Sequence, residues 1–84
     1  TISMKQNVPN PAKGSTIVNY TLPSAGKVQF QIVSITGQIL YKEEKDSQAG
    51  KNTIEFDVTN LSSGIYFYTM TFKGQKLVKK MTIE

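Results

Sequence analysis

Apolar and polar residues alternate with a period of two along most of this chain. In the run from Val18 to Leu22, apolar residues occupy every second position and polar residues lie between them. Successive side chains of a β-strand point to opposite faces of a sheet, so this spacing predicts a strand with one face in the core. Four runs show the pattern clearly, and their inward-facing residues are expected to be Val18, Tyr20, Leu22, Val28, Phe30, Ile32, Ile54, Phe56, Val58, Tyr66, Tyr68, Met70 and Phe72.

Turn-forming residues separate these runs. Glycine supplies positive φ angles, whereas proline, serine and asparagine favour tight turns for other local reasons. Such residues occur at Pro23–Gly26, at Ser34–Gly37, at residues 59–64 and at Lys73–Gln75. Because these signals recur at about 8–12-residue spacing with no helical period between them, the chain is predicted to be an all-β, antiparallel β-sandwich of six or seven short strands.

The first fifteen residues do not follow the pattern. Pro9 and Pro11 interrupt any regular ladder there, although Ile2 and Met4 alternate. We therefore predict that residues 1–15 are a linker that can contain a first edge strand, and that residues 16–84 form the folded domain.

Two later segments are also harder to assign. Residues 42–52 are strongly polar and lack an apolar stripe, so a long solvated loop is predicted. Before this segment, Ile39 and Tyr41 are expected to share one face of a returning strand. In the last run, Met81 and Ile83 favour one inward face and Val78 favours the other, so the pattern leaves both orientations open.

The composition lacks the common catalytic side chains. The chain has 84 residues, of which 38% are hydrophobic, with no cysteine and no histidine. Their absence removes thiolate nucleophiles, imidazole bases and the usual zinc ligands. We therefore expect no enzyme and no cofactor, and no direct insertion into a membrane, since no apolar run approaches the roughly 20 residues of a span. Because the chain opens on Thr1 without a leader, a larger parent protein is expected.

The positive charge comes from lysine alone. The net charge is +4 and the chain contains no arginine, the residue best suited to bidentate contacts with phosphate or guanine. We therefore expect no nucleic-acid partner. Four lysines gather near the last hairpin, where they could attract an acidic partner or could simply protect an edge strand from pairing. These lysines are Lys73, Lys76, Lys79 and Lys80.

Other candidate groups are weaker. Glu55 and Asp57 lie two apart on a predicted strand, but no third ligand or apolar pocket accompanies them in the sequence, so an exposed strand face is the simpler interpretation. Aromatic residues could form a carbohydrate-binding platform, but alternation places most of them in the core and there is no tryptophan.

Short motifs in a fixed order run through the chain: Asn10-Pro11, Val18-Asn19-Tyr20-Thr21-Leu22-Pro23, Gly26-Lys27-Val28, Thr36-Gly37-Gln38-Ile39, Leu61-Ser62-Ser63-Gly64-Ile65-Tyr66 and Lys79-Lys80. Together they resemble the C-terminal sorting domain of cargo proteins of the type IX (Por) secretion system. The resemblance covers about residues 7–84 and is carried by the whole series. One difference is Ser34, where members commonly have an acidic or amide residue; Ser34 is expected to make a similar, weaker bond to the local backbone.

The resemblance implies an immunoglobulin-like sandwich that directs a parent cargo protein, located N-terminal to it, across the outer membrane of a Gram-negative cell. The implied partners are the type IX translocon and a sortase-like enzyme that usually removes the domain. The implied route leads through the periplasm to the cell surface or the medium. The residues that fall in segments associated with signal activity are Gly64, Tyr66, Gly74, Lys76, Lys79 and Lys80.

Two other functions remain open from the sequence. A carbohydrate-binding or adhesive module would show Tyr41, Tyr66 and Tyr68 facing solvent, or a calcium site. A structural spacer would have further sequence on both sides, whereas a sorting domain is expected to end its precursor. A homodimer formed by pairing of edge strands is a further possibility that the sequence does not decide.

Overall fold

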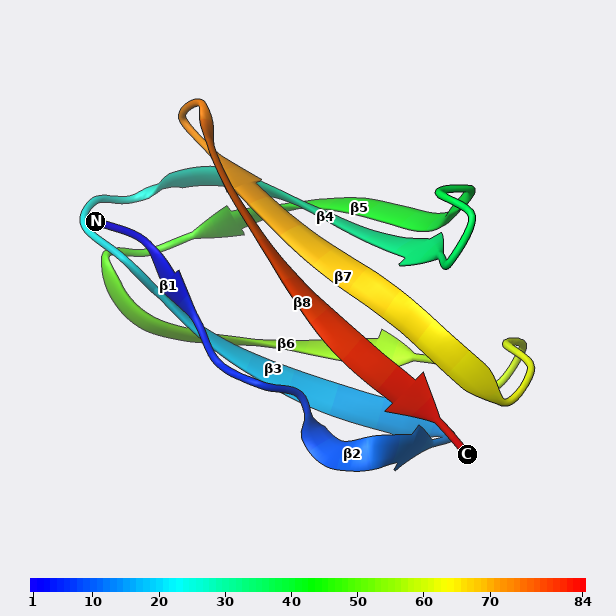
Figure 1. Cartoon of the computed structure of the whole chain (residues 1–84). Coiled ribbons are helices and arrows are strands. Elements are labelled where there is room, and N and C mark those ends of the chain that lie inside the picture. The colour runs from blue at the N-terminus through cyan, green and yellow to red at the C-terminus, as the bar shows by residue number, and fades with distance from the viewer.

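The chain folds into two packed β-sheets without a helix, as Figure 1 shows for the computed structural model of residues 1–84. The all-β prediction is confirmed. There are eight strands instead of six or seven, because the N-terminal segment contributes two short strands where at most one was expected. The strands are β1 (Ser3–Met4), β2 (Val8–Lys13), β3 (Ser15–Leu22), β4 (Gly26–Ser34), β5 (Ile39–Ser47), β6 (Gly50–Asp57), β7 (Gly64–Phe72) and β8 (Gln75–Ile83).

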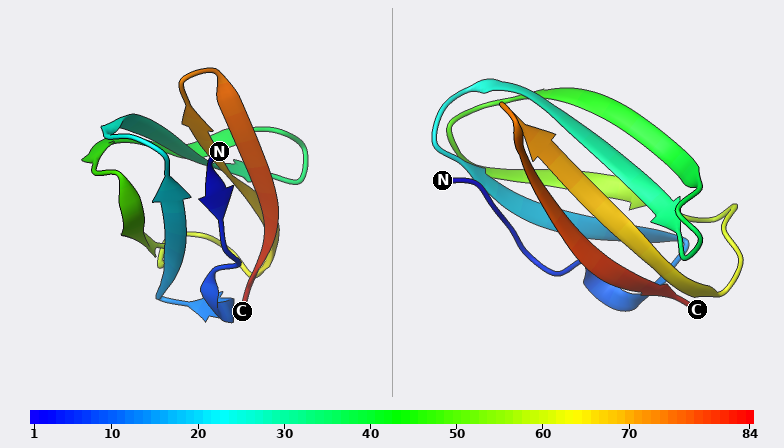
Figure 2. Two further views of the ribbon diagram at one scale, coloured as in Figure 1. Left: turned by 90° about the vertical axis from the view of Figure 1, so that its left-hand side faces the viewer. Right: turned by 45° about the horizontal axis from the view of Figure 1, so that its top comes forward.

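Antiparallel pairing builds each layer of the sandwich. In the first sheet β3 pairs with β6 on one side and with β1 and β2 on the other. In the second sheet the order is β5-β4-β7-β8. A single parallel pair between Ala12 of β2 and Ile83 of β8 joins the two layers along one edge. Figure 2 shows the same two layers from two further directions. Strands β5 and β6 each have one unpaired edge, and pairing of two copies there remains a prediction.

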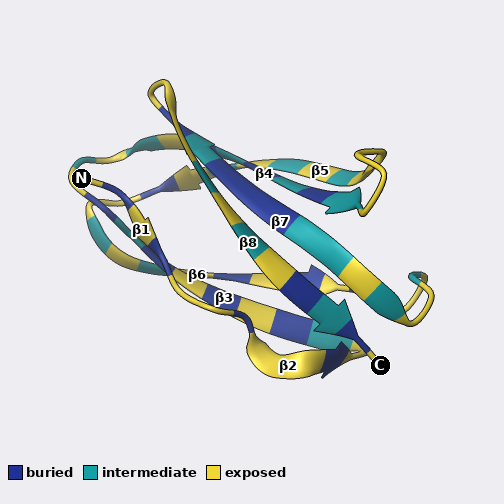
Figure 3. Ribbon diagram, viewed as in Figure 1, coloured by how far each residue is buried: buried dark blue, intermediate teal, exposed yellow.

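The inward faces form one continuous apolar core of 17 buried residues. All but one of the thirteen residues that alternation placed inward are fully buried in it, and the remaining one, Tyr66, is half-buried against it. Figure 3 shows the resulting alternation of buried and exposed positions along β3 and β8. Phe30 stands at the centre, with ring centroids 5.0 Å from Tyr20 and 6.0 Å from Phe56 in edge-to-face geometry. Such pairs stabilise the fold by about 0.5–1.5 kcal/mol beyond the burial of their area.

The prediction of a long loop over residues 42–52 is wrong. Strands β5 and β6 cover most of this segment, with a short connection between Ser47 and Gly50. Each is an edge strand, so its backbone pairs on one side only and its polar side chains can stay in solvent. The Ser47 hydroxyl reaches the Tyr20 hydroxyl in the core at 2.6 Å, which anchors the connection. The polar residues of this segment therefore indicate the exposed edges of the two sheets and not a loop.

A β-bulge changes the face that Ile39 occupies. Ile32 of β4 lies opposite Tyr41, but Val33 lies opposite Ile39, so one extra residue is inserted in β5 at this point. Tyr41 packs against the core, whereas Ile39 lies on the outer face with 54% of its surface exposed. The prediction that Ile39 and Tyr41 share a face is therefore wrong, because a bulge shifts the alternation by one residue.

The orientation of β8, which the pattern left open, is settled by burial. Met81 and Ile83 are buried in the core, and Val78 points outward with 55% of its surface exposed. The C-terminal half of β8 is also paired along its outer edge. There the Asn10 side chain accepts a hydrogen bond from the Thr82 amide at 3.1 Å.

The N-terminal segment is bound to the sandwich by the hydroxyl of Tyr68 in β7. This buried hydroxyl accepts a hydrogen bond from the Asn7 amide at 2.9 Å and donates one to the Lys5 carbonyl at 3.0 Å. Burial raises the pKa of Tyr68, so the hydroxyl remains protonated and able to donate at neutral pH. The Asn7 side chain, itself buried, donates to the Thr16 hydroxyl and to the Pro9 carbonyl. The division of the chain at residue 15 stays a prediction.

Removal of this hydroxyl should loosen the N-terminal segment. We expect Tyr68→Phe to lower the free energy of unfolding by about 1–3 kcal/mol, because the Asn7 amide and the Lys5 carbonyl lose their buried partner. Denaturation in urea measures this loss. Tyr66→Phe is the matched control: its hydroxyl bonds the Ser62 carbonyl at an exposed position, where water can take its place. Equal losses in the two variants would contradict the role given to Tyr68.

Candidate functional site

The β7–β8 hairpin carries the six residues predicted to act in sorting, and a tight turn sets its register. Lys73 and Gly74 form the two-residue connection, with φ angles of 46° and 83°. Two consecutive positive φ angles are typical of the type I′ turn, whose twist matches that of the flanking strands. The nine-residue pairing that follows, from Phe72↔Gln75 to Gly64↔Ile83, holds every outward side chain of β8 at a defined place.

Gly64 and Tyr66 support the other end of the hairpin. Gly64 has a φ of 150°, a conformation that is open almost only to glycine. No atom lies within 4 Å of the position that a Cβ would take, so glycine is required here by the backbone conformation and not by close packing. Tyr66 packs its ring on the core, and its hydroxyl donates to the Ser62 carbonyl at 2.7 Å. The two residues thus fix the turn before β7.

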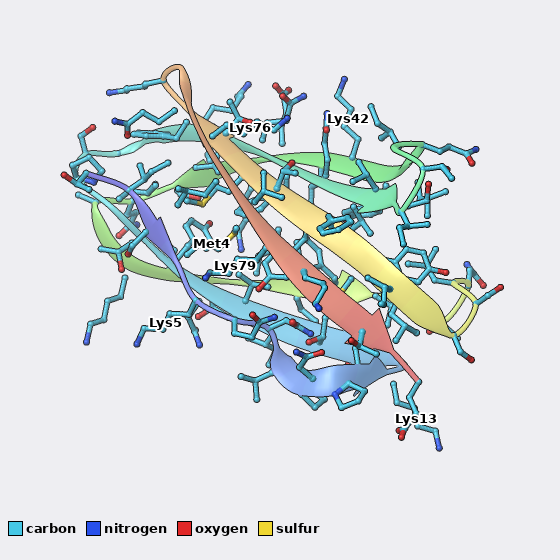
Figure 4. The ribbon with its side chains drawn as sticks, in the orientation of Figure 1. Met4, Lys5, Lys13, Lys42, Lys76 and Lys79 are labelled. Atoms are coloured by element: carbon cyan, nitrogen blue, oxygen red, sulfur yellow. The ribbon has the colours of Figure 1, made fainter.

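The four lysines near the hairpin do not form one strip. Lys76 and Lys80 are exposed on the outer face of the sheet, opposite Thr71 and Phe67 respectively. Lys79 is half-buried on the inner face, opposite Tyr68. In Figure 4, Lys76 projects on the side of the sheet away from the core, whereas Lys79 points from β8 toward β1 and Met4.

The Lys73 side chain makes contacts at the turn itself. Its ammonium group donates to the Ser24 hydroxyl at 3.1 Å and lies 5.2 Å from the centre of the Phe72 ring. Of the four lysines, only Lys76 and Lys80 therefore share the outer face, separated along β8 by about 13 Å of extended backbone.

Beside Lys76 the outer face has an apolar hollow that the sequence analysis missed. Its lining comes from β4, the β4–β5 turn, the start of β5, β7 and β8. We call this hollow the outer groove; its apolar residues are Val33, Ile35, Ile39, Phe67 and Val78, and its only charged residue is Lys76. A signal was present in the sequence: these residues occupy the faces opposite the core, where polar residues are expected. Their proximity, however, depends on strand order and on the bulge at Ile39.

Other sequence candidates are explained by local structure. No group of three or more acidic side chains could hold a metal ion. The Asp57 carboxylate instead accepts hydrogen bonds from the hydroxyl and the amide of Thr59, which lower the pKa of Asp57. Tyr68 is buried, so it cannot join Tyr41 and Tyr66 in an exposed aromatic row. Ser34 makes the expected local bond, accepting from the Gln38 amide at 3.1 Å. No helix is present that is long and apolar enough to cross a membrane.

Comparison with known families agrees with the resemblance. The model of the family described as "Secretion system C-terminal sorting domain" matches residues 8–84. The matched range contains β2 to β8, and therefore the whole β7–β8 hairpin and the outer groove. The resemblance predicted from short motifs over residues 7–84 is confirmed. No curated protein matches the chain.

A side chain at position 64 should strain the entry to the hairpin. We expect Gly64→Val to lower the free energy of unfolding by about 1–3 kcal/mol, because valine strongly disfavours the observed φ. Chemical denaturation measures the change. Ser63→Val is the control, since Ser63 is exposed and has no positive φ. A loss in Gly64→Val no larger than in the control would show that the backbone can relax at this point.

The Tyr41–Glu43 pair should give the fold a dependence on alkaline pH. The Tyr41 hydroxyl donates to the Glu43 carboxylate; this bond, partial burial and the nearby negative charge raise the pKa of Tyr41 to about 12. In the unfolded chain this pKa is about 10. The stabilisation is therefore fully present below about pH 10 and is lost as the pH rises toward about 12.

Ultraviolet titration of tyrosinate tests this assignment. Tyr41→Phe should remove the transition near pH 12, and Glu43→Gln should shift that transition toward about 10, the ordinary value. If Tyr41→Phe removes a transition at the ordinary value instead, the pair does not form in solution.

Proposed function

The chain belongs to the family of secretion system C-terminal sorting domains, and from this premise we propose that its β7–β8 hairpin is the surface that the export machinery binds. The domain is a C-terminal sorting signal of type IX secretion. A parent protein that carries it is exported to the cell surface or secreted, and the family is not an enzyme family.

The observation that carries the proposal is the placement of Lys76 and Lys80. Both ammonium groups project from one strand on the same exposed face, and the tight turn and the pairing with β7 fix their spacing. A fixed pair of cations can steer an acidic partner and set its register. Within this proposal Gly64, Tyr66 and Gly74 support the hairpin that presents the lysines. Lys79 acts at the edge between the sheets, where its ammonium group adds to the same field.

The remaining steps of sorting follow the family. We propose that the parent cargo precedes Thr1, that it crosses the periplasm with the sandwich already folded, and that a sortase-like enzyme then separates the two. The exposure of Thr1 supports the first step, because a preceding polypeptide meets no obstruction there. The continuous core supports the second step, since a surface made from two strands exists only after the sheet has formed.

A reporter fusion tests the proposal. Residues 1–84 are fused behind an inert reporter with a Sec signal peptide, in a host that has the type IX translocon. We expect surface display for the native sequence and at least a tenfold loss in the double variant Lys76→Glu/Lys80→Glu, with the reporter retained in the periplasm. Fractionation and surface labelling measure both pools.

The control is Lys13→Glu/Lys51→Glu, which makes the same change in net charge at exposed positions on the other sheet. Both double variants should keep the native melting temperature, because exposed charges contribute little to stability. Equal display of the two variants would contradict recognition through the hairpin. Deletion of residues 75–84 should also abolish display, but it removes the buried Met81 and Ile83 and so cannot separate recognition from folding.

A further inference from the structure

We propose that the outer groove binds an extended segment of the export machinery, in which apolar side chains are flanked by aspartate or glutamate. The inference rests on the proposed function and deepens it, because it names the chemistry of the partner segment and the place where it binds.

The first argument is the apolar content of an outer face. Ile35, Ile39 and Val78 are 69%, 54% and 55% exposed, although all three are large and apolar. Pairing makes the patch continuous, since Ile39 lies opposite Val33 and Val33 lies opposite Phe67 on three neighbouring strands. Apolar residues scattered singly on a surface are ordinary, whereas a contiguous and recessed set is typical of a binding site.

The second argument is the charge around the groove. Lys76 is the only charged residue in its lining. Pairing places Lys80 beside Phe67, and places Lys42 at the far end of the row that runs through Gln31 and Thr69 to Val78. Glu44 lies at the far end of the neighbouring row, which leads to Lys76, so three lysines stand against one carboxylate in this part of the face. Figure 4 shows Lys42 and Lys76 on the same side of the sheet. An apolar segment with carboxylates near its ends would complement this arrangement.

A second copy of the chain fits the groove poorly. In a symmetric dimer the same patch meets itself, so Lys76 would find no carboxylate in the groove lining of the second copy. Like charges placed face to face oppose association.

A lipid surface also fits poorly. Ile35, Ile39 and Val78 are exposed, but Val33 and Phe67 between them are half-buried, so a flat bilayer would leave these two residues without a contact, whereas an inserted side chain can reach them. A polypeptide segment that inserts apolar side chains between the lysines is the occupant that satisfies both features.

Paired variants test the groove by export of the reporter fusion. Ile39→Ser/Val78→Ser removes apolar surface from the groove, and Val8→Ser/Ile17→Ser removes the same residue types from exposed positions outside it. We expect at least a tenfold loss of surface display for the groove variant and less than a twofold change for the control, with equal melting temperatures. If the native fusion is not displayed, the proposed function fails. If the native fusion and the groove variant are displayed equally, only the present inference is overturned.

Photo-crosslinking in the same cells identifies the occupant. A benzophenone amino acid replaces Val78 in one fusion and Ile17 in another, and the crosslinked peptides are sequenced by mass spectrometry. We expect the probe at position 78, but not at position 17, to capture a segment of an export component with apolar residues next to Asp or Glu. Adding Lys76→Glu should lower this yield at least tenfold. Capture of a second copy of the domain, of lipid, or of a segment without acidic residues would overturn the inference, as would absence of an adduct at position 78.

Discussion

The Tyr68 hydroxyl is the point at which the two sheets and the N-terminal segment are joined. From the middle of β7 it bonds the backbone at Lys5 and Asn7, and so holds the stretch between β1 and β2 against the core. The position of β2 beside the end of β8 depends on this attachment, because Ala12 then meets Ile83 and closes one edge of the sandwich. The Asn7 amide is buried and would be costly to leave without a partner, so this bond opposes any shift of the segment along β7. The register of β8, and with it the outward direction of Lys76 and Lys80, is therefore supported from both sides.

Most of the inward faces could be predicted from the sequence because alternation is a local property. Val28, Phe30 and Ile32 are buried as expected, since a strand that covers a core shows a period of two whatever its neighbours are. The strand at residues 39–47 could not be recognised in the same way. Its stability comes from backbone pairing with β4, and an edge strand held in this way does not need the alternating apolar residues by which a strand is recognised. The bulge opposite Val33 was equally hidden, because it is defined by the pairing of two strands and not by either alone.

The candidate site could be predicted from the sequence only in part, for the same reason. Lysines near the last hairpin are visible in the sequence, but their faces differ: Lys79 turns inward beside Tyr68, whereas Lys80 turns outward beside Phe67. The outer groove combines residues from β4, β5, β7 and β8, from Gln31 to Val78, which lie 47 positions apart in the chain, so it can be predicted only when the strand order is known. Its apolar members looked like the second faces of ordinary strands, and only their arrangement side by side distinguishes them.

The use of a folded sheet as a sorting signal has a physical consequence that a flexible tail would not share. In β7, Tyr68 and Met70 face the core, whereas Phe67 and Ile65 lie on the outer face, half-buried and exposed respectively, so one strand contributes to stability and to the outer surface through alternate residues. The backbone loses its conformational entropy during folding, so binding of a partner to the folded surface orders fewer residues of this domain. Under the proposed recognition, display is conditional on folding, because the spacing of Lys76, Val78 and Lys80 relative to Phe67 exists only once β7 and β8 have paired. On this proposal a cargo whose sorting domain is unfolded presents no complete surface, and binding of the folded surface also serves as a check on the folded state of the signal.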